Sequence, residues 1–227
     1  MSKYRKEQNY LDHQAIDLSS KQIANIKNLY PCYLGIISFG EIPSTILNTI
    51  RFQIESVFES FIYDIVFIGE NKLEPCLFDL RVKEEYNLLD QKLKKVFLLP
   101  TNEFYSIVKY QMVAHNLEIG LGLTHIPLYS SSDEKLLFLF GEANMKHNCA
   151  VVSTHNLDIS KDKLNDNRII KEVIHEIGHL ILGIQHCFNN KCVMCFSANV
   201  EDIDKKTLNL CKNCKSELVK IRATNNF

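Results

Sequence analysis

The chain has 227 residues, of which 46% are hydrophobic and 23% charged. This composition is typical of a soluble globular protein and excludes wholesale disorder. Lys and Arg total 26 against 27 Asp and Glu, so no basic excess attracts nucleic acid or an anionic membrane. The N-terminal stretch MSKYRKEQNYLDHQ lacks the apolar segment of a secretory signal, and no apolar run is long enough to span a bilayer. We therefore expect a cytoplasmic protein with reduced thiols, not associated with membranes.

The first half of the chain predicts a strand–helix–strand unit. Residues 1–28 are polar and are expected to form a tail or docking segment. Tyr33–Gly40 and Ile62–Gly69 are apolar runs typical of buried strands, and Pro43 with Ser44 opens a stretch with helical periodicity between them. This order predicts a parallel pair of strands with a crossover helix, and hence an α/β fold.

Further elements are expected along the chain, although residues 70–95 give no clear signal. Thr101 is expected to cap a helix that runs to about Leu117. Asn165–Asn167 is a cap signal, and Gly183 is placed to end the helix that follows. The remaining expected elements are strands over Leu121–Tyr129, Leu136–Phe140 and Cys149–Thr154, a helix over Arg168–Leu182 and a helix that begins near Glu201.

The predicted helix before Gly183 contains the pentapeptide HEIGH. Its residues His175 and His179 are four positions apart, so both lie on one helix face and can reach one tetrahedral ion. Glu176 stands between them, where a carboxylate can accept the proton of a metal-activated water. A third ligand is required, and His186 follows the glycine closely. The alternative is a pair of buried helix histidines that bind no metal.

A second group of candidate metal ligands lies at the C-terminal end. Five of the eight cysteines fall in one short segment: Cys187, Cys192, Cys195, Cys211 and Cys214. Two pairs with CxxC spacing match a closed four-cysteine zinc site. The spacing leaves open whether Cys187 or Cys195 completes the site with Cys192, Cys211 and Cys214. Basic residues in the same region suggest nucleic-acid binding as a further alternative, but a solvated helix face explains them as well.

Together these motifs resemble the archaemetzincins, a branch of the metzincin zinc metallopeptidases. That family has the pattern HExxHxxGxxHC, then four residues, Cys-x-Met, a spacer and CxxC. Here the corresponding segments are HEIGHLILGIQHC, FNNK, CVM and, after a spacer, CKNC. The resemblance covers about Tyr33 to Leu218. It implies a twisted mixed sheet packed on an active-site helix and a second long helix (residues 29–183), followed by a small C-terminal zinc subdomain (residues 184–227).

The resemblance also implies a role for each matching residue. His175, His179 and His186 would bind a catalytic zinc ion, with Glu176 as the general base that activates a zinc-bound water for attack on a peptide bond. Met194 would form the hydrophobic base beneath the metal. A second, structural zinc ion would be held by Cys187, Cys192, Cys211 and Cys214. The strand near Cys149–Thr154 would be an edge strand that pairs with a peptide or protein substrate.

One departure from the family pattern leads to an alternative function. The chain has three residues between His179 and Gly183, where the family has two. One added helical residue rotates the helix exit by about 100°, which a π-bulge could absorb. If His186 then fails to reach the metal, the protein would be a catalytically weak or inactive zinc-stabilised peptide-binding protein.

Overall fold

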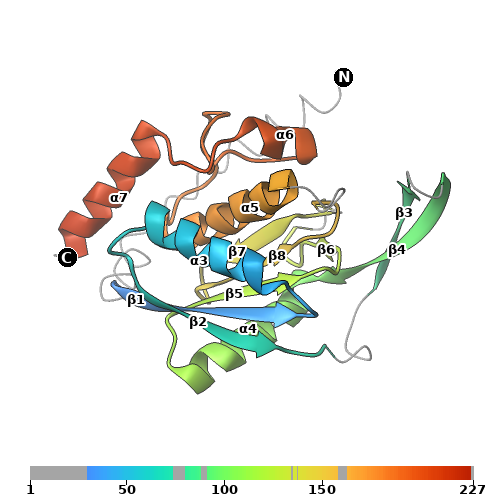
Figure 1. Ribbon diagram of the computed structural model, residues 1–227, viewed down its shortest axis with the longest axis horizontal. Coiled ribbons are helices and arrows are strands. Elements are labelled where there is room, and N and C mark those ends of the chain that lie inside the picture. Colours follow the sequence, from blue (N-terminus) through green and yellow to red (C-terminus); the bar gives the residue numbers. More distant parts are fainter. Residues whose placement is uncertain are drawn as a thin grey trace.

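The computed structural model describes residues 30–73, 80–87, 91–133, 135–136, 138–157 and 163–225; the segment predicted over residues 1–28 lies outside them. A five-stranded sheet with the order β2-β1-β5-β8-β7 forms its centre (Figure 1). The first four strands in this order run parallel, and β7 runs antiparallel to β8. The strands are β1 (Cys32–Phe39), β2 (Ile62–Glu70), β5 (Ile119–Thr124), β7 (Gly141–Asn144) and β8 (Cys149–Ser153).

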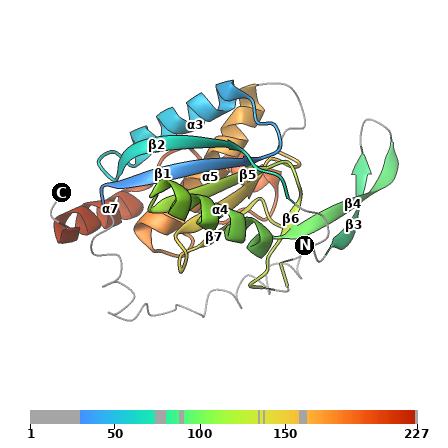
Figure 2. The same cartoon turned by 90° about the horizontal axis from the view of Figure 1, so that it is seen from below.

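Helices cover both faces of this sheet. Helices α3 (Ser44–Val57) and α5 (Lys163–Leu182) lie on one face, and α4 (Thr101–His115) lies on the other (Figures 1 and 2). Each face has its own cluster of buried apolar side chains, the larger of them under α3 and α5. The predicted β1–α3–β2 unit, with its parallel pairing, is confirmed, as is the α/β class.

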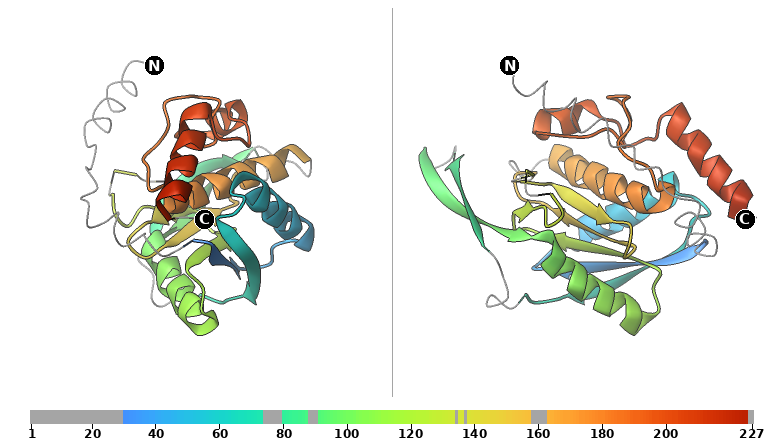
Figure 3. Two further views of the ribbon diagram at one scale, coloured as in Figure 1. Left: turned by 90° about the vertical axis from the view of Figure 1, so that its left-hand side faces the viewer. Right: turned by 180° about the vertical axis from the view of Figure 1, so that it is seen from behind.

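A hairpin of β3 (Arg81–Asn87) and β4 (Lys92–Pro100) projects from the body (Figures 1 and 3). It occupies part of the region that gave no clear sequence signal. Strand β4 also pairs with the short strand β6 (Leu128–Tyr129). The strand predicted over Leu121–Tyr129 is therefore wrong as a single element. It divides into β5 and β6, which belong to different sheets.

Other predicted boundaries are also corrected. The described residues of the predicted strand Leu136–Phe140 do not form one: Leu139 makes an isolated bridge to Leu128, and the strand β7 begins after the run. Helix α5 begins earlier than predicted, so Asn165–Asn167 lie inside it. Thr101 is not a cap, because Pro100 holds the cap position and the Thr101 hydroxyl bonds to Glu142 and Ser131 instead.

The C-terminal segment lies across α5 (Figure 3, right). It contains two helices, α6 (Val200–Lys205) and α7 (Lys212–Asn225), where one was expected. Its residues Val193, Met194 and Ile203 are fully buried in the same apolar cluster as the inner face of α5. In the part of the chain that the structure describes, no helix has the length and apolar character needed to cross a membrane.

Candidate metal centres and cleft

Helix α5 and the loop that follows it bring the three candidate histidines together. The helix stays α-helical to Leu182, and the Gly183 amide still donates to the His179 carbonyl at 3.0 Å. Gly183 then adopts a φ of +62°, a conformation that suits glycine, and turns the chain back. As a result, ring nitrogens of His175, His179 and His186 lie within 4.8 Å of one another. The one additional residue between His179 and Gly183 extends the regular α-helix and forms no π-bulge.

The hydrogen bonds of the first two histidines determine which ring nitrogen is free. The Nδ1 atom of His175 lies 2.8 Å from the Val193 carbonyl oxygen, and that of His179 lies 2.7 Å from the Ile184 carbonyl oxygen. A carbonyl only accepts, so each Nδ1 carries the proton and each Nε2 presents a lone pair. The two Nε2 atoms face each other at 3.1 Å. Two facing lone pairs repel, so this arrangement fits a cation between them.

Burial keeps the His175 and His179 rings neutral, because it lowers the pKa of His175 well below the ordinary value and lowers that of His179 as well. His186 is the exposed member of the group. Neutral imidazole is the form that binds metal. Burial, and after it the carboxylates of Glu172 and Glu142, raise the pKa of Glu176 well above the ordinary value. A divalent cation beside Glu176 would oppose this shift and favour the carboxylate.

Met194 lies buried against the same turn of α5. A Cβ atom added at Gly178 would come within 2.3 Å of the Met194 sulfur, so only glycine allows this close approach. The backbone around the methionine also positions the histidines. The Met194 carbonyl accepts from the Cys187 amide at 2.8 Å, and its neighbour Val193 accepts from His175. The sequence motif identified Met194, and the structure places it next to the active-site helix.

A cavity of about 160 Å³ opens beside the histidines. His175, Glu176 and His186 form part of its lining, and apolar residues before β7 form a wall. Strand β7 passes directly over the carboxylate, because a Cβ atom at Gly141 would lie 2.8 Å from Glu176 Oε1. Among the described residues, β7 pairs with β8 alone in the main sheet, so it is the edge strand on this side, with β2 at the opposite edge. The prediction that the strand at Cys149–Thr154 is the edge is wrong, because β8 lies between β5 and β7.

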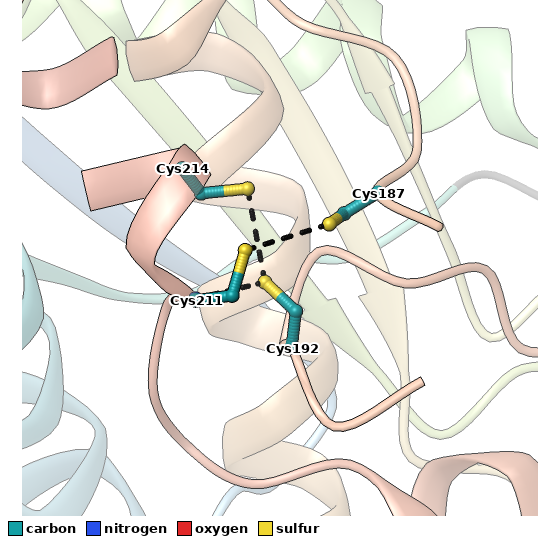
Figure 4. Close-up of side chains that lie close together, drawn as sticks. All are labelled: Cys187, Cys192, Cys211 and Cys214. Atoms are coloured by element: carbon teal, nitrogen blue, oxygen red, sulfur yellow. Dashed lines mark hydrogen bonds between the residues drawn. The ribbon is translucent and has the colours of Figure 1, made fainter. Parts of the chain in front are cut away.

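Four cysteines from the C-terminal segment converge on one another (Figure 4). Their sulfur atoms all lie within 4.8 Å of one another, with 3.7 Å between Cys187 and Cys211 and 3.7 Å between Cys192 and Cys214. Cys195 does not belong to this group. Geometry therefore favours Cys187 over Cys195 as the fourth ligand. Such a closed set of four thiols is the donor set of a structural zinc site.

Two charged residues near the cleft were missed. Glu172 and Lys206 form a buried ion pair with an Nζ–Oε1 distance of 3.2 Å. Lys206 is one of the basic residues of the C-terminal region that a solvated face was expected to explain, yet it is 3% exposed. Helical periodicity could have identified Glu172, which is one turn before Glu176 on α5 and therefore shares its face. No signal in the sequence identified its partner, because the pairing depends on how the segment after α6 crosses α5.

The comparisons with known proteins agree with this geometry. The model of peptidase family M54 matches residues 26–220. An archaemetzincin from Pyrococcus furiosus is 31% identical over 189 residues, which are 81% of this chain and 90% of that protein. One from Archaeoglobus fulgidus is 39% identical over 102 residues, 45% of this chain, and the match spans only 61% of that relative's length. The crystal structure of an archaemetzincin from Methanopyrus kandleri superposes with a TM-score of 0.65 at 25% identity, over 84% of this chain and 95% of that one.

Proposed function

Because this chain belongs to peptidase family M54, the family of the archaemetzincins, we propose that it is a zinc-dependent metallopeptidase with His175, His179 and His186 as ligands of the catalytic zinc. The observation that carries this assignment is the pair of facing Nε2 lone pairs on His175 and His179, with His186 in reach. Glu176 lines the same cavity as the general base. The substrate is a peptide or protein.

Different residues of the chain have different roles in peptide hydrolysis. Zinc, when bound, supplies a Lewis acid that polarises the peptide carbonyl and makes water more acidic. Glu176 accepts the proton of the attacking water and passes it to the leaving amine. The free side of β7 offers backbone groups to an extended peptide, which aligns the peptide along the cleft. Met194 packs against Gly178 on α5 and so stabilises the turn of the helix that carries the histidines.

A second zinc ion is proposed at Cys187, Cys192, Cys211 and Cys214. Its role is structural, because four thiolates leave no open coordination position. Each chain would then hold two zinc ions, one catalytic and one structural. We retain a cytoplasmic location as part of the proposal, since reduced thiols are needed at this site.

The alternative function, an inactive peptide-binding protein, rested on the additional residue before Gly183. The structure removes that reason, because His186 lies with the other two histidines. The family membership likewise favours a peptidase. We therefore do not retain the alternative.

Zinc content and hydrolysis together test the proposal. Protein purified without added metal is expected to hold two zinc equivalents and to cleave members of a random peptide library. Glu176→Gln should keep both equivalents and lose at least 100-fold in kcat/KM, at the low end of the roughly 10²–10⁴-fold contribution of a general base. Glu103→Gln, at a half-buried position on α4, on the opposite face of the sheet from α5 (Figure 2), is the matched control and should leave the rate unchanged. Undiminished hydrolysis by the Glu176 variant would contradict the mechanism.

A further inference from the structure

The cavity beside Glu176 is lined by both apolar and polar residues. Its apolar walls are formed by Leu136, Phe138, Leu139, Phe140 and Phe196. Two polar residues, Glu172 and Ser197, line the same cavity. Its volume of about 160 Å³ suits one amino-acid side chain. Since His175 and Glu176 also line it, the occupant belongs to a residue next to the scissile bond.

The polar residues have unused hydrogen-bonding capacity. The Ser197 hydroxyl is buried and has no hydrogen-bond partner among the described residues. Glu172 accepts one hydrogen bond from Lys206, and a carboxylate can accept about four. The Glu172 and Lys206 side chains are 5% and 1% exposed, so the pair is shielded from solvent and carries no net charge. Buried polar groups of this kind favour an occupant that completes their hydrogen bonds.

Building on the proposed function, we infer that this cavity selects a glutamine side chain beside the scissile bond. The glutamine stem matches the apolar walls. Its terminal amide can donate to Glu172 and accept from Ser197, which satisfies both groups. A Lys or Arg side chain would bring a second cation to Lys206, and an acidic side chain would bring a further anion to Glu172 and Glu176. A wholly apolar side chain would leave the Ser197 hydroxyl unpaired.

Cleavage specificity provides the first test. A peptide library that varies both residues flanking the cleaved bond is digested by the zinc-loaded protein, and the products are identified by mass spectrometry. Glutamine at one flanking position is expected to give about 10-fold higher kcat/KM than leucine, lysine or glutamate, as one or two well-placed hydrogen bonds allow. No cleavage of any member would contradict the proposed peptidase function. Cleavage with leucine, lysine or no residue preferred would overturn the glutamine inference alone.

Two variants of the polar lining residues test the inference further. Replacing both members of the ion pair, Glu172→Met with Lys206→Met, removes the charges together and retains an apolar interior of similar volume. The preference should then change to leucine or methionine. Ser197→Ala leaves the pair intact, so it remains informative if the double variant fails to fold. It should lower kcat/KM for glutamine peptides about threefold or more relative to leucine peptides, because the variant loses a hydrogen bond to glutamine and no longer has a hydroxyl that leucine leaves unpaired. Arg51→Met with Glu55→Met, an exposed pair on α3, is the control.

Binding without turnover gives an independent readout. Fluorescence anisotropy measures the affinity of the Glu176→Gln protein for a labelled glutamine peptide found in the library and for its leucine counterpart. About 10-fold tighter binding of the glutamine peptide is expected, and the double methionine variant should reverse the order. Equal affinities in the parent protein would contradict the inference even if hydrolysis is observed.

Discussion

The two candidate metal sites lie close together in the chain but are built in different ways. The histidine site rests on α5, whose inner face is buried in the main apolar cluster, and two of its rings are held by backbone carbonyls. The cysteine site joins two loops and the first turn of α7, and two of its four cysteines, Cys187 and Cys211, are only half-buried. Packing shapes the first site. At the second site we expect a bound zinc ion to help hold the segments together.

Loss of one cysteine ligand should have the largest effect. Structural zinc contributes on the order of 10 kcal/mol to the folding of small zinc domains. Cys192→Ser is therefore expected to release one zinc equivalent and to unfold the segment around α7, as measured by metal analysis and hydrogen exchange. Cys195→Ser is the matched control, because Cys195 lies outside the cluster. If the Cys195 variant loses zinc and the Cys192 variant does not, the proposed ligand set is wrong.

Loss of the third histidine should affect the metal but not the fold. His186→Ala is expected to weaken zinc binding at the histidine site by about 100-fold or more, since three protein ligands become two. The thermal transition of the zinc-free protein should barely change, because α5 is held by its own packing. Competition with a chelator measures the affinity. His115→Ala, at the exposed end of α4, should have no effect, and an unchanged affinity in the His186 variant would show that His186 is not a ligand.

A smaller effect is expected where α5 meets Met194. Gly178→Ala places a methyl group about 2.3 Å from the methionine sulfur. Overpacking of this kind lowers the free energy of unfolding by about 1–3 kcal/mol. Urea unfolding of the metal-free protein measures the change. Ser106→Ala, on an exposed part of α4, controls for a general effect of alanine. A Gly178 variant that is as stable as the parent would mean that the methionine moves away at little cost.

The smallest effect concerns the projecting hairpin. Although burial raises the pKa of Glu85, the hydrogen bonds from His155, Lys83 and Asn156 outweigh it and lower this pKa below the ordinary value. A carboxylate with a lowered pKa in the folded state stabilises above its unfolded pKa, and this contribution is lost as the pH falls through the folded value. The protection factors of the β3 amides, which are corrected for the intrinsic pH dependence of exchange, should therefore fall below about pH 4.3. Glu85→Gln should remove this pH dependence, and a parent hairpin that stays equally protected in acid would contradict it.

Local patterns in the sequence predicted the chemistry better than the topology. The HEIGH motif, the following glycine and the cysteine spacing identified residues that the structure brings together, because helix periodicity and short turns link residues that are near in sequence. The extra residue before Gly183 was harder to interpret. Sequence alone allowed His186 to miss the site, and only the folded chain shows that the left-handed turn at Gly183 returns it.

The sequence by itself determined the α/β class, the parallel β1–α3–β2 unit, and the residue types at both sites. Tertiary structure alone decided which strand is the edge, since strand order depends on pairing between distant segments such as β7 and β8. It also placed Cys187 and not Cys195 in the cluster, a choice that the cysteine spacing left open and that the family resemblance implied, and it buried Lys206 against Glu172. These outcomes depend on how segments far apart in the chain pack on α5, and no local pattern of residues encodes that packing.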